Sequence, residues 1–215
     1  MSGDAMSIRR QMAVSAGLLA LFAVIGGVLV AGTETLTRDR IIEQQRAALR
    51  ATLNEVLPAD RYTNTLLDDT VTLSDPDLLG TDEPVIGYRA WLGDEPVALL
   101  FPVVAPDGYS GDIRLLIGVD ADGVLTGVRV LDHRETPGLG DAIETRRGDW
   151  IRQFAGLSLD QPPAAQWKVR KDGGQFDQFA GATITPRAVV KAVRKALVFF
   201  EQNQNLLFTQ PPTSP

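Results

Sequence analysis

The N-terminal part of the chain is dominated by one long apolar segment. No charged residue occurs from Gln11 to Thr33, and residues 12–31 are almost wholly apolar. About 20 helical residues, each rising about 1.5 Å, cross a bilayer core of about 30 Å. The pattern therefore predicts a short N-terminus at residues 1–11, followed by a single membrane-spanning helix at residues 12–32.

The charges that flank this segment predict its orientation. Arg9 and Arg10 precede it, whereas Glu34, Arg38 and Asp39 follow it with mixed signs. Because cytoplasmic flanks carry an excess of Lys and Arg, we expect the short N-terminus in the cytoplasm and everything after residue 33 on the other side of the membrane. A cleaved signal peptide is the alternative, but its apolar core would be unusually long and no Ala-x-Ala site closes it.

Beyond the span, the apolar positions change to those of an amphipathic helix. One side of that helix collects Leu36, Ile41, Ile42, Leu49, Leu53 and Val56. Pro58 ends the pattern, because the residue before a proline disfavours helical geometry. We expect a stalk helix over residues 33–58.

The remaining pattern, over residues 59–208, predicts one α+β domain. Short alternating segments bounded by turn residues are typical of strands, and they lie near 71–73 and at 85–91, 97–104, 113–119 and 124–131. A short helix is expected at 149–154 and a further strand at 167–170. Together these elements predict one twisted antiparallel sheet packed on helices.

A last amphipathic helix is expected from Pro186 to about Gln204. Its apolar side comprises Val189, Val190, Val193, Leu197 and Phe200. Thr185 is suited to the N-cap, and Pro186 to the first helical position, where its missing N–H costs nothing. The Pro-rich tail, residues 209–215, is expected to be disordered.

Composition restricts the chemistry of this domain. The chain has 27 acidic and 21 basic residues, a net charge of −6, which argues against binding to nucleic acid. It has no cysteine, so disulfides, thioether-linked haem and cysteine-held iron–sulfur clusters are excluded. With His133 as its one histidine, a zinc or di-iron site is disfavoured. A redox cofactor would have to be organic.

The segment Gly181-Ala182-Thr183-Ile184 lies just before the predicted last helix. Unpaired N–H groups and the positive end of the helix dipole favour a phosphate at such a position, and the small residues leave room for a bulky group. A simple capping turn is the alternative interpretation of the same residues.

Asp177 to Thr185 resembles the flavinylation motif of the FMN-binding domain family. In that family an acidic residue precedes a Ser/Thr-Gly-Ala-Thr run, whose last threonine carries FMN through a phosphoester bond made by a dedicated flavin transferase. The resemblance implies covalent FMN on Thr183, with cofactor contacts from Asp177, Gly181, Ala182 and Thr185. At Ala180 the family more often has Ser or Thr.

A second segment resembles the same family. Residues 135–140 read Glu-Thr-Pro-Gly-Leu-Gly, as does a loop that lies against the flavin in its members. The resemblance implies contacts from Glu135, Thr136, Pro137, Gly138, Leu139 and Gly140. From local chemistry alone we interpret Asp132 and Glu135 as parts of a solvated turn, and His133 as a weak candidate for a hydrogen bond to flavin.

The order of these features is similar to that of the RnfG family, the G subunits of Rnf complexes. The resemblance implies an electron carrier in a translocase that couples electron flow between ferredoxin and NAD+ to movement of Na+ or H+. Its partners would be the other Rnf subunits, the flavin transferase and membrane lipid. Two alternatives are the C subunit of a sodium-pumping NADH:quinone reductase and a membrane-anchored flavin-binding assembly module without electron flux.

Overall fold

The computed structural model describes residues 3–209, without the side chains of residues 3–11 and of Thr35, Leu36 and Asp39. These residues form two compact units that divide between Leu49 and Arg50. The expectations for residues 1–2 and for the tail beyond Thr209 lie outside the described residues, as do those that depend on the side chains of Arg9 and Arg10.

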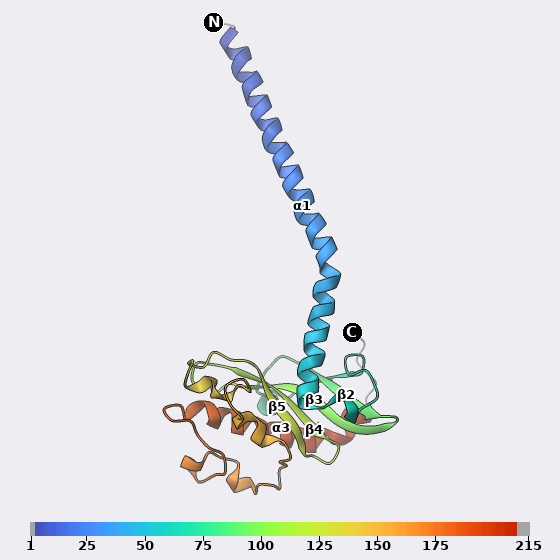
Figure 1. Ribbon diagram of the computed structural model, residues 1–215, viewed down its shortest axis with the longest axis vertical. Coiled ribbons are helices and arrows are strands. Elements are labelled where there is room, and N and C mark those ends of the chain that lie inside the picture. Colours follow the sequence, from blue (N-terminus) through green and yellow to red (C-terminus); the bar gives the residue numbers. More distant parts are fainter. Residues whose placement is uncertain (1–2, 210–215) are drawn as a thin grey trace. The chain divides into compact units, whose positions relative to one another are not determined.

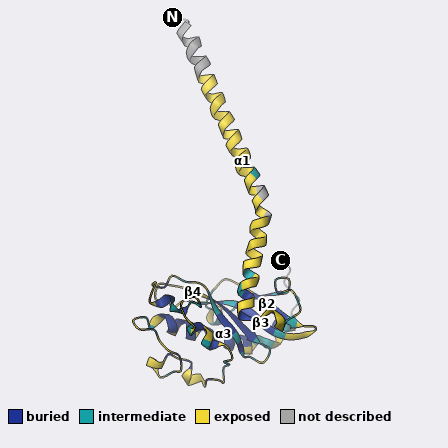
Figure 2. Ribbon diagram, viewed as in Figure 1, coloured by how far each residue is buried: buried dark blue, intermediate teal, exposed yellow. Residues whose placement is uncertain are grey.

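Helix α1, Gly3–Val56, begins in the first unit (Figure 1). Within it, Met12–Glu34 has the length and apolar composition of a membrane span, close to the predicted 12–32. Its large apolar side chains are exposed, from Met12 at 67% to Val30 at 69% (Figure 2). The Thr33 hydroxyl donates to the carbonyl of Leu29 at 2.6 Å, so it is satisfied inside the helix. An apolar surface of this extent requires a lipid or protein environment.

The second unit contains a five-stranded antiparallel sheet in the order β1-β2-β3-β4-β5. Its strands are β1 Thr70–Leu73, β2 Val85–Leu92, β3 Glu95–Ala105, β4 Ile113–Asp120 and β5 Leu125–Asp132. Neighbouring strands in the sheet are also neighbours in sequence, and every pair is antiparallel. The predicted α+β class and its antiparallel sheet are confirmed.

One face of the sheet is covered by α3, Ile184–Thr209 (Figure 1). Alternate residues of β3 and β4, including Leu99, Phe101 and Ile117, point into the core that α3 closes. The rings of Phe101 and Phe199 lie 5.7 Å apart across this contact. The short helix α2, Pro76–Leu79, also packs against α3.

The intervening residues of the strands form a second buried layer with the last turns of α1. Leu53, Val56 and Leu57 are at most 1% exposed. Gly118 and Gly127 are register partners in β4 and β5, and both lie under Val56. A Cβ atom on Gly127 would lie 3.2 Å from the Val56 carbonyl oxygen. Because neither glycine has a side chain, the helix packs directly on the strand backbone at these two positions, which are called the glycine seat below.

Between β5 and α3 the chain forms short 3-10 turns: η2 Gly140–Ile143, η3 Trp150–Phe154, η4 Ala164–Gln166 and η5 Arg170–Asp172; a further one, η1 Ala59–Arg61, follows α1. The predicted short helix at 149–154 is confirmed. The strand predicted at 167–170 is wrong. A tight turn folds this segment back on itself, and a Cβ on Gly174 would lie 1.9 Å from the Lys168 carbonyl oxygen.

Filling the glycine seat should destabilise the domain. A Cβ on Gly118 would lie 2.3 Å from Thr126 Oγ1 and 2.5 Å from Val56 Cγ1. We expect Gly118→Val to lower the free energy of unfolding by about 1–3 kcal/mol through overpacking. Urea unfolding of the detergent-solubilised chain measures this. Gly148→Val is the control, because a Cβ there meets no atom within 4 Å; equal midpoints for both variants would contradict the prediction.

Candidate functional site

The turn that carries Thr183 leads directly into α3. Gly181 has φ +78°, a left-handed conformation that favours glycine. The N–H of Ala182 donates to the carbonyl of Phe179 at 3.1 Å and closes the turn. The N–H of Arg187 then donates to the carbonyl of Thr183 at 3.4 Å, which is the first bond of the helix. Thr183 therefore occupies the N-cap position.

The prediction that Thr185 is the N-cap is wrong. Thr185 lies in the first turn of α3 and is fully buried. Its hydroxyl donates to Oε2 of Glu135, fifty residues away in sequence, and so links α3 to the 135–140 loop. Pro186 is the third residue of the helix, still within the first turn, where a missing N–H costs nothing.

Glu135 is the buried carboxylate around which the site is built. It is only 4% exposed, so the interpretation of this residue as part of a solvated turn is wrong, whereas Asp132 is exposed as expected. Its Oε1 accepts from the backbone N–H of Ser110 at 2.9 Å, and its Oε2 accepts from the Thr185 hydroxyl. A buried carboxylate is tolerated when such donors replace water.

Close backbone approach around Glu135 requires glycine at two positions. A Cβ on Gly140 would lie 2.8 Å from Glu135 Cβ and 3.0 Å from Thr185 Oγ1. A Cβ on Gly108 would lie 2.1 Å from the carbonyl oxygen of Gly111. The 135–140 loop and the 108–111 loop can therefore meet the first turn of α3 only without side chains at these points.

These segments enclose a pocket of about 270 Å³. It is lined by Tyr109, Glu135, Thr136, Leu139, Gly140, Gly181, Ala182, Thr183, Ile184 and Thr185. Eight of the residues expected to contact the cofactor thus line one pocket.

Three of the expected contacts lie elsewhere. Asp177 is exposed and pairs with Arg170 at 2.9 Å, while its carbonyl accepts from the Trp150 indole N–H at 2.8 Å. Pro137 lines a neighbouring pocket. Gly138 stabilises the loop instead, because its N–H donates to Oδ1 of Asp141 at 2.8 Å.

Tyr109 lines the pocket but has no local signature in the sequence. It is a single tyrosine in the connection between β3 and β4, 67% exposed. Leu139 and Ile184 lie on the same pocket and are each 44% exposed. The three form an apolar rim, a name used below for these residues.

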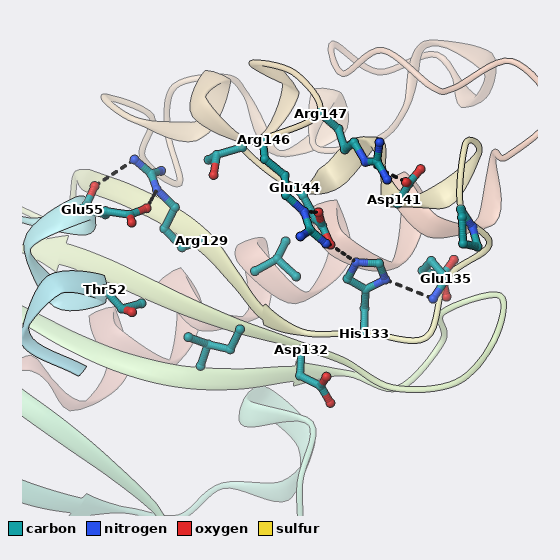
Figure 3. Close-up of a pocket in the computed structure, with 14 residues that line it drawn as sticks. Thr52, Glu55, Arg129, Asp132, His133, Glu135, Asp141, Glu144, Arg146 and Arg147 are labelled. Atoms are coloured by element: carbon teal, nitrogen blue, oxygen red, sulfur yellow. Dashed lines mark hydrogen bonds and ion pairs between the residues drawn. The ribbon is translucent and has the colours of Figure 1, made fainter. Parts of the chain in front are cut away.

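A larger, polar pocket of about 620 Å³ lies beside the first and shares Glu135 with it (Figure 3). His133 lies here: its Nδ1 accepts from the N–H of Glu135 at 3.0 Å, and its Nε2 lies 2.8 Å from Oε1 of Glu144. Because a backbone N–H can only donate, Nδ1 must be unprotonated and Nε2 carries the hydrogen. Both ring nitrogens are thus engaged away from the Thr183 pocket.

Each of the three arginines that line the polar pocket has an acidic partner. Arg129 Nε lies 3.0 Å from Oε2 of Glu55, and Arg146 binds Glu144. Arg147 Nε lies 3.0 Å from Oδ2 of Asp141, an ion-pair distance without hydrogen-bond geometry. Asp132 and Glu135 line the same pocket without a cationic partner among the described residues, so its acidic groups outnumber its arginines and disfavour an anionic ligand.

Two family models match this chain. The FMN-binding domain matches residues 108–198, and the RnfG N-terminal region matches residues 1–56. A Shewanella loihica protein, named as the G subunit of an ion-translocating oxidoreductase complex, is 46% identical over 204 residues, which are 95% of this chain and 96% of the relative. A Pseudomonas aeruginosa protein of the same name is 52% identical over 199 residues, 93% of either chain. This chain belongs to the RnfG family.

The two matched regions cover helix α1 and the part of the chain that contains the site. A Vibrio atlanticus protein of the same name is 47% identical over 194 residues, 90% of this chain and 92% of its own length. The match to the RnfG N-terminal region ends at Val56, where α1 ends. All ten residues that line the Thr183 pocket lie within the matched FMN-binding domain.

The pocket of this RnfG chain suits a group with a phosphate and an apolar ring. The N–H groups of Ile184 and Thr185 precede the first helical hydrogen bond, so they and the helix dipole favour an anion beside Thr183. The apolar rim offers contact to a ring. Among the described residues that line the pocket, the acidic one is Glu135, and both of its oxygens already accept hydrogen bonds.

The hydrogen bond from Thr185 to Glu135 should contribute more to the free energy of unfolding than a buried hydroxyl without a partner does. Thr185→Val removes the donor without changing side-chain volume, and leaving the carboxylate short of a partner costs about 1–3 kcal/mol. We expect that loss in urea unfolding. Thr126→Val is the control, because the buried Thr126 hydroxyl has no hydrogen-bond partner. The same loss can be measured in a double-mutant cycle of Thr185→Val and Glu135→Gln. If the two losses of unfolding free energy simply add, the two side chains do not interact directly.

The polar pocket should make stability depend on pH in an acidic window. The hydrogen bond from Arg146, with a smaller one from His133, lowers the pKa of Glu144 from 4.5 to about 2. A lowered pKa stabilises the fold above about pH 4.5, and this contribution is lost as pH falls toward 2. We expect the thermal midpoint of Glu144→Gln to fall less than that of wild type over this window. Arg146→Gln should weaken the dependence likewise, and identical slopes in all three would contradict the assignment.

Proposed function

We propose that this chain carries FMN covalently on Thr183 and relays electrons within a membrane-bound ion-translocating oxidoreductase complex. The observation that carries the proposal is the position of Thr183, at the N-cap of α3 and on one pocket with residues of the 135–140 loop. The two segments that resemble flavin-binding motifs begin 42 positions apart, at Glu135 and Asp177, yet residues of both line one pocket. The attachment would be a phosphoester made by a flavin transferase.

FMN supplies the electron transfer, and the residues of the chain bind and orient it. The N–H groups of Ile184 and Thr185 would hold the phosphate at the positive end of α3. Glu135 would keep the loop and the helix at a fixed separation. The apolar rim would exclude water from the ring. A covalent link is favoured outside the cytoplasm, where free FMN is scarce and a dissociated cofactor would not be replaced.

The wider assignment rests on the relatives, which are named as G subunits of an ion-translocating oxidoreductase complex. We propose that this chain is the corresponding component of an Rnf complex, which passes electrons between ferredoxin and NAD+ and moves Na+ or H+. The other Rnf subunits, the flavin transferase and membrane lipid would be its partners. Arg9 and Arg10 support an N-terminus in the cytoplasm and an FMN domain on the periplasmic side of the inner membrane.

Covalent attachment predicts a fluorescent band on a denaturing gel. With the native flavin transferase co-expressed, we expect wild type and Thr183→Ser to fluoresce under ultraviolet light, because both retain a hydroxyl. Thr183→Val should be dark while inserting into the membrane at the wild-type level. A dark wild-type band would contradict the proposal and leave Thr183 as a helix-capping residue.

The same variant separates an electron relay from an assembly module. A complex that contains Thr183→Val should assemble but lose ferredoxin-driven NAD+ reduction, and the wild-type flavin should change redox state within one turnover. Unchanged turnover in an assembled Thr183→Val complex would favour the assembly module.

A further inference from the structure

Tyr109 combines an exposed ring with a fixed backbone. Its loop is held on both sides: Asp107 pairs with Lys191 of α3, and the N–H of Ser110 donates to Glu135 at 2.9 Å. The ion pair also lowers the pKa of Asp107. Gly108 packs so closely on Gly111 that no side chain would fit. The 67% exposure of Tyr109 is therefore imposed by a constrained loop.

Within residues 50–209, Tyr109 differs from every other described aromatic side chain. The remaining Phe, Trp and Tyr residues of this range are buried or half-buried, many of them in contact with each other, such as Trp150 and Phe179 at 5.1 Å. Tyr109 is the one aromatic ring exposed there, and it lines the Thr183 pocket. An aromatic side chain held in water beside a pocket is available to a ligand.

The apolar rim strengthens this interpretation. The large apolar side chains exposed within residues 50–209 are Ile86, Leu92, Tyr109, Leu131, Leu139, Ile184 and Leu206. Three of these seven line one pocket of about 270 Å³. Such a concentration of apolar surface fits a flat aromatic ligand better than it fits solvent.

We propose that Tyr109 stacks on the isoalloxazine ring of the flavin borne by Thr183 and forms the aromatic cover of the pocket. This proposal rests on the proposed function. Offset stacking between the phenol and the ring is the contact that such a side chain offers, and Leu139 and Ile184 would complete the apolar surroundings. Glu135 would act indirectly, as a positioning residue, because it fixes the loop that carries Tyr109.

Flavin fluorescence of the native, detergent-solubilised chain tests the contact. A stacked phenol quenches an excited flavin by passing one electron to it, and the electron then returns, so no net reaction occurs. We expect several-fold brighter native fluorescence in Tyr109→Phe and Tyr109→Leu than in wild type. Tyr88→Phe and Trp150→Phe are the controls and should leave the fluorescence as in wild type.

Iodide quenching separates stacking from mere proximity. In Tyr109→Phe the ring is still covered, so iodide accessibility should match that of wild type, whereas in Tyr109→Leu it should rise. Unchanged native fluorescence in both variants would overturn the role of Tyr109.

Denaturing-gel fluorescence keeps this result separate from the proposed function. Equal bands for all variants establish that flavin is attached, so that a failure of the native assay concerns Tyr109 alone. A dark wild-type band overturns both proposals.

Discussion

The pairing of the buried Glu135 carboxylate with its two donors is the contact on which the site depends. It joins the loop after β3, the loop after β5 and the first turn of α3, which are distant in sequence. A carboxylate out of water must be supplied with hydrogen-bond donors, so Ser110 and Thr185 cannot move independently of it. The pocket beside Thr183 therefore has walls whose separation is set by one side chain.

Glu135 also separates two different environments. It lines both the small pocket with its apolar rim and the larger polar pocket. In the larger pocket, His133 binds Glu144 through Nε2 and accepts from the N–H of Glu135 through Nδ1, so it fixes the start of the 135–140 loop. The polar groups of the larger pocket thus hold the 135–140 loop, while the apolar rim lies on the Thr183 pocket.

Local patterns predicted the sheet, α3 and the turn before it, because alternation and helical spacing are properties of neighbouring residues. The pairing of Thr185 with Glu135 could not be predicted in this way, and the helix begins at Ile184, two residues before the expected start at Pro186. The position of Tyr109 could not be predicted either, because no neighbouring residue indicates that its ring lies on the same pocket as Thr183, more than seventy residues later. The prediction of a strand at 167–170 was wrong because Gly174 allows a tight turn there, and the alternation of apolar residues gives no sign of such a turn.

The seat formed by Gly118 and Gly127 has a consequence for where the domain begins. Leu53 and Val56 belong to its interior although they lie on α1, the same helix that contains the apolar span. The boundary between anchor and domain thus falls inside a continuous helix. A soluble fragment cut at Pro58 would lose a wedge of its own core and expose a flat apolar sheet surface prone to association, whereas one that starts near Arg50 would keep that surface covered.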